Sequence, residues 1–522
     1  MNRLTKRLWL LIFVLGGAAV LLVGWGSPRV IGSNGDSAAP QAATCNIVLS
    51  SDVPHDAVIP KSHIGNPTAI QVDFDTLSWN TFIALNWPSN PKYRGQPDPD
   101  KSKKIGLQDY SNVVWETYKE SYDVFIADAQ GNPVRPTGWN SVPNPPPGCG
   151  QNSAYQTKFG KPVRVVKNIS KDGLNEFLEA VSLAPLIDQK GAFARYEVLV
   201  NEDEFKHIMN PANPLTALIA PPLYDSRNQK NVNFPVGKPG GPEGPIEVKA
   251  AWKLLGQYDN PNRYHTEWIQ IAWPATTTAP IQYKCSQPML VGLIALHIAH
   301  KTFNAPQWVW STFEQVDNYT VPPGSPFGAK ASFFNPNCRN CPANVAPTQP
   351  AAGWSGDPSV LNQGPPTQVV PGNSAKVKTS CNDVAWQLLR SVNPNTVWQY
   401  YRLVNTQWPQ DPYCGSGPCP VYNPPTLAHQ GANQLPVNMA NAVIETYLMG
   451  PPESADLPSC MACHNFATGL QTGQPLDFSF ALQEAYPINA GALRAQRRTL
   501  AMKTGIRVPP ARGRTRVLKV DR

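Results

Sequence analysis

Charged residues are scarce in this 522-residue chain, where Asp, Glu, Lys and Arg make up only 15% and hydrophobic residues 41%. So little charge, together with abundant proline and tryptophan, argues against a coiled coil. The apolar share is large enough for a real core, which excludes wholesale disorder. The chain also lacks a G-x-S-x-G elbow, a P-loop, an H-E-x-x-H helix and a dinucleotide fingerprint. Most of the sequence therefore carries no signature of a known enzyme class.

Only the last part of the chain has an excess of charge of one sign. Residues 494–522 hold ten basic groups and one acid, a net charge of +9, so the other 493 residues sum to −1. This electrically balanced part does not have the excess of basic residues that is typical of nucleic-acid-binding proteins. The basic tail is interpreted either as a solvated extension or as a contact for an anionic membrane surface or an acidic partner.

Long hydrophobic runs are also absent, with one exception at the N-terminus. Leu8 to Trp25 is an uninterrupted apolar run that follows Arg3, Lys6 and Arg7. A basic start before an apolar stretch is typical of a secretion signal, and about 18 residues is just enough to span a bilayer once. Residues 1–26 are therefore predicted to be a signal peptide or an N-terminal signal anchor. The rest is expected to be exported to a bacterial periplasm, soluble or anchored.

Proline is abundant, with 56 residues at about twice the usual share of about 5%. The prolines have no period, which excludes collagen and predicts long loops between short elements. The segments rich in β-branched and aromatic residues are expected to be strands: Tyr196–Val200, Ile246–Leu255, Tyr264–Trp273, Leu290–His300, Trp308–Val316 and Thr396–Trp408. Helices are expected over Phe74–Trp87, Ser111–Phe125, Asp383–Arg390 and Leu435–Met449. Without a βαβ rhythm, the pattern predicts an α+β fold with an antiparallel, β-rich, sandwich-like body and flanking helices.

Ten cysteines in an exported protein predict disulfides. Two of them belong to the motif described next, and the other eight allow up to four bridges. Two pairs, 338/341 and 414/419, are close enough in sequence to close small loops. The eight are Cys45, Cys149, Cys285, Cys338, Cys341, Cys381, Cys414 and Cys419.

The motif that carries chemistry is Cys460-Met461-Ala462-Cys463-His464, a C-x-x-C-H sequence typical of covalent haem attachment. Two thiols three residues apart on a helical turn can both reach the vinyl groups on one edge of a porphyrin. The next residue then directs its imidazole at the iron. Cys460 and Cys463 are predicted to hold one haem c as thioethers, with His464 as the proximal ligand. The alternatives are a disulfide and part of a zinc site. A zinc site needs further ligands close by, and residues 465–522 contain no further Cys or His.

With these three residues the chain resembles the c-type cytochromes over about 60–90 C-terminal residues. Members of that family usually carry a distal methionine well downstream of the motif, and here the only downstream methionine is Met502. The distal ligand is therefore sought among Met502, Met439, Met449, His429, His297 and His300. The last two, if they lie on a strand, face opposite sides of it and cannot share one site.

The expected organisation has five parts. They are a signal or anchor (1–26), a linker (27–60), an α+β body of unassigned function (61–431), a small helical haem c segment (432–493) and the basic tail (494–522).

The resemblance implies a single-haem cytochrome that transfers one electron to or from an unidentified redox partner, rather than an enzyme that turns over a substrate. Two other hypotheses stay open. The first is a haem enzyme of the peroxidase or oxygenase kind with an open distal site. The second is an exported binding module in which the haem is sensory or structural. Nucleic acid is not an expected partner, whereas the N-terminal segment or the basic tail could contact a membrane surface.

Overall fold

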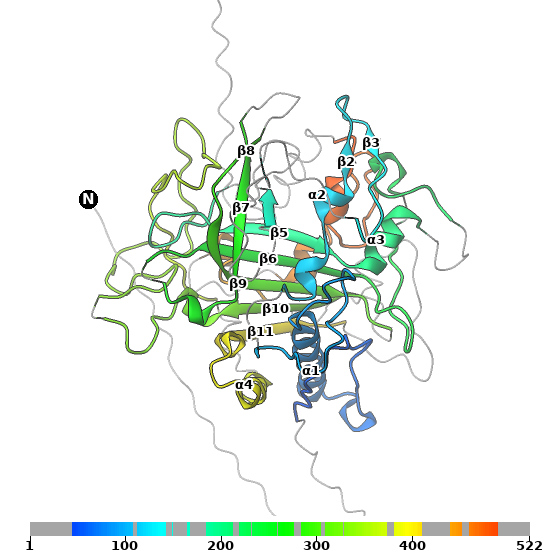
Figure 1. Cartoon of the computed structure of the whole chain (residues 1–522), viewed down its shortest axis with the longest axis horizontal. Helices are drawn as coiled ribbons and strands as arrows, with labels where there is room; N and C mark the ends of the chain where they lie inside the picture. The colour runs from blue at the N-terminus through cyan, green and yellow to red at the C-terminus, as the bar shows by residue number, and fades with distance from the viewer. Residues whose placement is uncertain are drawn as a thin grey trace, which may run out of the picture. The chain divides into compact units, whose positions relative to one another are not determined.

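The strands form one large sheet that organises the rest of the fold in a computed structural model of the chain (Figure 1). All described residues belong to a single unit, Ala42–Arg522. The structure describes residues 44–107, 112–141, 149, 164–167, 184–211, 219–230, 232–257, 259–275, 283–303, 308–326, 328–372, 381–409, 439–450 and 459–488.

The large sheet has nine strands in the described part of the chain, and its main path runs β1-β5-β6-β9-β10-β11. Strand β7 pairs with the beginning of β9, and β4 and β8 pair with β7. Every pair is antiparallel except β4 with β7. The strands are β1 (Lys119–Glu120), β4 (Arg164–Lys167), β5 (Arg195–Val200), β6 (Ile246–Leu254), β7 (Thr266–Pro274), β8 (Tyr283–Cys285), β9 (Met289–His300), β10 (Val309–Gln315) and β11 (Tyr401–Gln407). A separate two-stranded sheet joins β2 (Ile126–Ala127) and β3 (Pro133–Val134).

Strand β9 is the centre of the sheet because its sequence, MLVGLIALHIAH, is apolar almost throughout. Such a run is typical of a strand that is buried on both faces. One edge of β9 pairs with β6 over nearly its whole length. Its other edge pairs first with β7 and then with β10.

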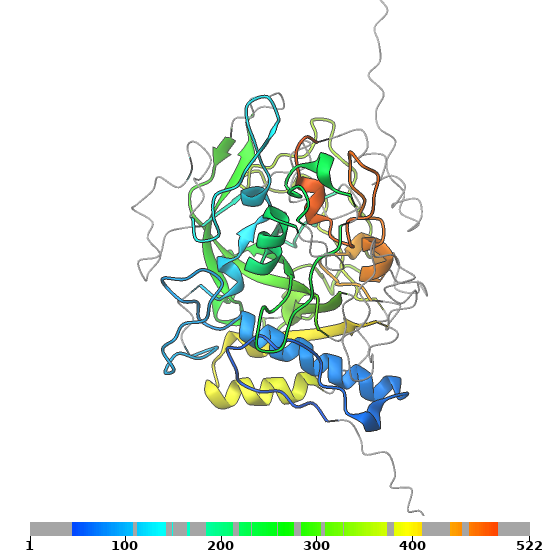
Figure 2. The same cartoon turned by 90° about the vertical axis from the view of Figure 1, so that its right-hand side faces the viewer.

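Helix α1 (Pro67–Leu85) covers one face of the sheet together with α4 (Cys381–Val392), and Figure 2 shows the two helices side by side. Asn66 caps α1 by accepting a hydrogen bond from the N–H of Ala69. The helix is apolar on most sides because the sheet and α4 both bury it. Its buried Ser78 hydroxyl lies 2.7 Å from the hydroxyls of Ser311 on β10 and Thr406 on β11.

The opposite face of the sheet is covered by what we call the C-terminal segment, residues 439–450 and 459–488. It includes α5 (Thr446–Met449) and α6 (Cys460–His464). Asn441 donates to the Thr312 hydroxyl of β10 at 2.8 Å, and the Trp308 indole donates to the Asp477 carbonyl at 2.7 Å. The C-terminal segment and the body therefore share one core.

The α+β class with a large antiparallel sheet and flanking helices is confirmed. Helices and the C-terminal segment cover this sheet in the described part of the chain, rather than a second sheet of similar size. The strands expected near residues 196, 246, 264, 290 and 308 form, with ends shifted by a few residues, and the helices expected near 74 and 383 also form. The strand expected over Thr396–Trp408 forms only from Tyr401, because Val397–Tyr400 is a 3-10 helix.

Two expected helices are wrong. Residues 112–125 form a short 3-10 helix (Trp115–Thr117), β1 and α2 (Ser121–Val124) in place of one helix. In the expected helix 435–449, only α5 is helical among the described residues. The Asn441 amide there bonds to Thr312 and to the Phe313 carbonyl, so sheet contacts fix the backbone in another conformation.

Three disulfides are present among the described cysteines: Cys45–Cys381, Cys149–Cys285 and Cys338–Cys341. The third is one of the two local pairs expected from the sequence, and the other, 414/419, lies outside the described residues. Residues 1–26 and 494–522 also lie outside them. In the part of the chain that the structure describes, no helix has the length and apolar character needed to cross a bilayer.

Candidate haem-attachment site

The C-x-x-C-H motif forms a helix of its own. Helix α6 spans all five residues of the motif, and Ser459 caps it by accepting a hydrogen bond from the N–H of Ala462 at 3.1 Å. Residues three apart on a helix are neighbours on its surface. Cys460 and Cys463 therefore lie on the same side of one turn, as the sequence predicted.

The sulfurs of Cys460 and Cys463 are not bonded to each other, and both side chains are half-buried. All other cysteines in the described residues are paired. The structure thus favours two free thiols over the disulfide alternative. No other His, Cys, Asp or Glu within the described ranges completes a group of three metal ligands with them, so a zinc site gains no support.

His464 is oriented by a hydrogen bond from its ring. Its Nδ1 lies 2.7 Å from the carbonyl oxygen of Phe478, and because a carbonyl only accepts, Nδ1–H donates. This tautomer leaves the lone pair on Nε2, the nitrogen that a metal would take. Trp310 and Phe480 pack against the ring with centroids 4.2 Å and 5.0 Å away. Burial lowers the pKa of His464 to about 4, so the imidazole is neutral at neutral pH.

The surroundings of the two thiols oppose their ionisation. Burial is the main cause that raises the pKa of Cys463 to about 12, and the carboxylate of Glu445 adds to the shift. Burial raises the pKa of Cys460 well above its usual value, with Glu445 again contributing. Reactive and metal-binding cysteines are thiolates in electropositive surroundings. The surroundings of Cys460 and Cys463 instead favour an uncharged sulfur. The sulfur of a thioether is also uncharged.

One face of the sheet brings several polar side chains toward the motif. By register, Lys249 on β6 is opposite His297 on β9, and His297 is opposite Thr312 on β10. The Trp310 indole donates to the sulfur of Met461 at 2.9 Å. Gln407 accepts a hydrogen bond from the N–H of Met461 at 2.9 Å. Strands β10 and β11 thus fix the position of α6 on the sheet.

His297 is the described distal candidate that faces the motif. Its Nε2 makes no hydrogen bond in the described part of the molecule, and the nearest acidic oxygen, from Glu445, is 3.6 Å away. Burial lowers the pKa of His297 well below its usual value, and Lys249 and His464 lower it further. The ring is therefore neutral and lies within electrostatic reach of His464.

Two of the other described candidates, His300 and Met449, are engaged elsewhere. His300 lies three residues along β9 and binds the carbonyl of Glu243 through Nε2 at 2.8 Å, away from the motif. Met449 is buried in a second apolar cluster with Tyr447. Met439 is buried in the main core cluster, which also contains Met461. His429 and Met502 lie outside the described residues.

Sequence reasoning missed Trp310, Phe478 and Glu445 as parts of this site. The alternation of residues 308–316 indicated that Trp310 and Thr312 share a face, but it gave no sign that this face receives α6. The large sheet and α1 bury most tryptophans, including Trp79, Trp115, Trp252, Trp308 and Trp408, which supports their role as core residues.

Comparison with known proteins gives no match, whether to a protein family, to a curated protein or to a solved structure. Arguments about function therefore rest on the residues and the geometry described above.

Proposed function

We propose that this chain is an exported c-type cytochrome that carries one covalent haem on Cys460 and Cys463, has His464 as proximal ligand and transfers single electrons. The observation that carries the proposal is the arrangement on α6. Two unbonded thiols share one helical turn, and the next residue is a neutral imidazole whose Nδ1–H is donated to the Phe478 carbonyl. Hydrogen bonding of this kind to the remote ring nitrogen is typical of metal-ligating histidines.

The protein residues around His464 would hold its ring in one orientation. Trp310 and Phe480 limit rotation of the ring, and the Phe478 carbonyl selects the tautomer. When bound, the haem supplies a one-electron Fe(III)/Fe(II) couple. Partial burial around α6 lowers the local dielectric, which would strengthen the effect of Lys249 and Glu445 on the potential.

The test is covalent attachment. We expect the full chain, expressed with export and haem c maturation, to keep stoichiometric haem after denaturation in acidified organic solvent. Cys460→Ala together with Cys463→Ala should reduce the retained haem to background, because both thioether positions are lost.

The matched control is Cys338→Ala with Cys341→Ala, which removes the other C-x-x-C pair of the chain, a disulfide on a surface loop. The control should retain its haem. The proposal fails if the wild-type chain is folded after maturation and yields no denaturation-resistant haem.

We assign the distal position to His297. Among the described candidates, it combines a half-buried, neutral ring, a buried Nε2 without a hydrogen bond in the described residues and a position on the face that carries the motif. His464 and His297 would then fill both axial positions, as in a protein built for electron transfer rather than for binding a small substrate at iron.

The potential of this site should depend on pH through Glu247 of β6. Its carboxylate accepts the Ser479 hydroxyl at 2.8 Å, one residue from Phe478. Burial raises the pKa of Glu247 to about 7, although Ser479 and Lys249 oppose the shift. A reduced site is more negative and raises this pKa further, so reduction takes up a proton. We expect the midpoint potential to fall with rising pH near pH 7, by at most about 59 mV per pH unit.

Potentiometric titration of the holoprotein from pH 5 to 9 measures this dependence. Glu247→Gln should flatten it near pH 7. Glu204 lies nearby and is fully buried. In the described residues neither of its carboxylate oxygens has a hydrogen bond. Burial and Glu247 raise the pKa of Glu204 well above the usual range. Glu204 therefore favours its protonated form more strongly than an ordinary glutamate does. An unchanged slope in Glu247→Gln would assign the proton to another group.

A haem enzyme with an open distal site is the second candidate, and the His297–Glu445 pair favours it. A half-buried imidazole 3.6 Å from a carboxyl group whose pKa burial raises to about 7 could move protons at an unligated iron face. Carbon monoxide binding by the wild-type ferrous protein, with peroxide turnover, would support this candidate over electron transfer.

The proposed location is the bacterial periplasm. The three disulfides fit an oxidising compartment. We propose that the redox partner is another exported protein, and that residues 1–26 or 494–522 contact the membrane surface. A fractionation of cells that express the full chain, before and after a salt wash, distinguishes a released, a peripheral and an anchored protein.

A further inference from the structure

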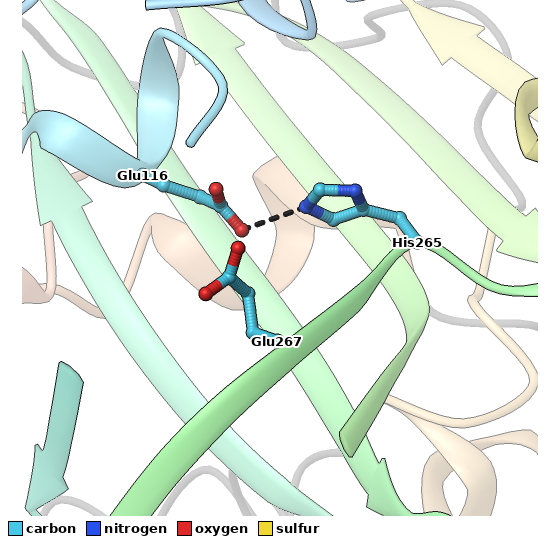
Figure 3. A group of neighbouring side chains, drawn as sticks. All are labelled: Glu116, His265 and Glu267. Carbon is cyan, nitrogen blue, oxygen red and sulfur yellow. Dashed lines mark hydrogen bonds and ion pairs between the residues drawn. The ribbon is translucent and has the colours of Figure 1, made fainter. Parts of the chain in front are cut away.

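A second group of metal-ligating side chains lies apart from the C-x-x-C-H motif. It consists of Glu116 on the 3-10 helix and His265 and Glu267 at the beginning of β7 (Figure 3). One ligand atom from each residue lies within 4.8 Å of the other two. His265 and Glu267 are two residues apart on extended backbone, so both side chains leave the chain on the same side. Figure 3 shows the Glu116 carboxylate pointing at both of them.

Groups outside the cluster hold its members in place. The Nε2 of His265 is 2.7 Å from Oε1 of Glu116, and the other oxygen of Glu116 accepts the N–H of Val113 at 3.0 Å. The His265 ring is stacked on Trp398 with centroids 4.8 Å apart. The backbone N–H of His265 donates to the Tyr401 hydroxyl at 2.9 Å. Outer contacts of this kind orient ligands before a metal binds.

Two buried carboxyl groups and an imidazole meet in this cluster. Glu116 and His265 are each 4% exposed, and Glu267 is 8% exposed. Like charges a few ångströms apart repel strongly where the dielectric is low. A divalent cation between Glu116 and Glu267 balances both charges and leaves His265 neutral, which is the form that binds a metal.

The donor set indicates the class of ion. Bonds of about 2.0–2.2 Å to one ion place two donors at most about 4.4 Å apart, so small side-chain movements would close the group. One imidazole nitrogen with two carboxylates suits zinc, manganese or ferrous iron. Calcium and magnesium prefer oxygen alone, and cuprous copper prefers sulfur.

This group lies on the α1 side of the sheet. Trp398, which stacks on His265, also packs against Phe82 of α1 with centroids 5.5 Å apart. The C-x-x-C-H motif contacts the opposite face through Trp310 and Gln407. The two sites are therefore built from different residues, and the following inference does not depend on the haem.

We propose that Glu116, His265 and Glu267 form a non-haem metal site that binds one divalent ion of the zinc, manganese or ferrous-iron class. The ion joins the 3-10 helix to the beginning of β7, two parts of the chain that are far apart in sequence. Because all three ligands are buried, the role of the ion is structural.

The experiment uses the full matured chain, purified without a polyhistidine tag. Elemental analysis should find about one zinc, manganese or non-haem iron per chain. After treatment with a chelator, titration with Zn²⁺ or Mn²⁺ should show one site. Glu267→Gln, which keeps the size of the side chain, should weaken binding at least tenfold, in line with the 10–100-fold cost of disturbing such a site.

The matched control is His63→Gln, which breaks a His–carboxylate pair of the same length, 2.7 Å to Asp73, that belongs to no three-ligand group in the described residues. It should bind metal as the wild type does. X-ray absorption at the edge of the bound metal gives an answer even if Glu267→Gln fails to fold, since nitrogen and oxygen ligands alone are expected. Sulfur ligands, or a folded wild-type chain that contains and binds no divalent ion, would overturn the proposal.

Discussion

Replacing His297 with alanine is expected to make the ferrous protein bind carbon monoxide, which the wild type should not do. The His297 side chain is half-buried on β9, and its buried Nε2 has no hydrogen bond in the described residues. The ring is neutral because desolvation, Lys249 and His464 all lower its pKa. Removing it opens one axial position. Carbon monoxide should change the absorbance spectrum of the reduced variant and leave the spectrum of the reduced wild type unchanged.

His300→Ala is the matched control for this prediction. His300 lies on the same strand, is buried and has its pKa lowered to about 4 by burial, but its Nε2 bonds to the Glu243 carbonyl. Its loss should leave the spectrum unchanged. If neither variant binds carbon monoxide, the distal ligand lies in residues such as Met502 or His429. If the wild type already binds carbon monoxide, the result supports the haem-enzyme candidate and counts against electron transfer.

Replacing Lys301 with methionine is expected to cost about 3–5 kcal/mol in the free energy of unfolding, the usual result of breaking a buried ion pair by removing one partner. The Lys301 ammonium lies 2.5 Å from Asp477, and the two side chains are 1% and 0% exposed. Asp477 also accepts the N–H of Phe234 at 2.7 Å. Without Lys301, the Asp477 carboxylate would be left near Glu204 in a dry core.

Urea unfolding of the holoprotein measures this loss. Lys206→Met removes a lysine whose pair with Glu202 is largely exposed, so it should stay close to wild type. Adding Asp477→Asn to Lys301→Met removes the stranded charge and should recover part of the stability. A loss below about 1 kcal/mol for Lys301→Met would mean that the core tolerates the Asp477 carboxyl without its lysine. Because Asp477 precedes Phe478, the variant should also change the haem spectrum.

Much of the sheet could be predicted because its strands carry their own signal. The run from 290 to 300 is apolar apart from two histidines, and it forms the central strand β9. The wrong helices have a different cause. Leu435–Met449 has a helical apolar stripe, yet Asn441 bonds to β10, more than a hundred residues earlier in the chain. Contacts between distant segments decide such cases, and no local pattern contains them.

The same limit applies to the candidate site. The motif itself was readable because its spacing is local. Its support was not, since the Phe478 carbonyl reaches His464 from a tight bend in which Asp477 and Phe478 both have positive φ, 49° and 66°. Such angles are uncommon for residues other than glycine, and the sequence around Asp477 and Phe478 does not predict a bend. The Glu116–His265–Glu267 group likewise depends on a fold that joins distant segments.

The Cys45–Cys381 disulfide has a consequence for the reach of the protein. It fastens residue 45 to α4, so the linker expected over 27–60 is held to the body from Cys45 onward. The free tether after an anchor at 1–26 is then residues 27–44, which span at most about 65 Å when fully extended. An anchored protein could exchange electrons only with partners that come within reach of this span and the body attached to it. If the apolar segment is instead removed, that restriction on its partners disappears.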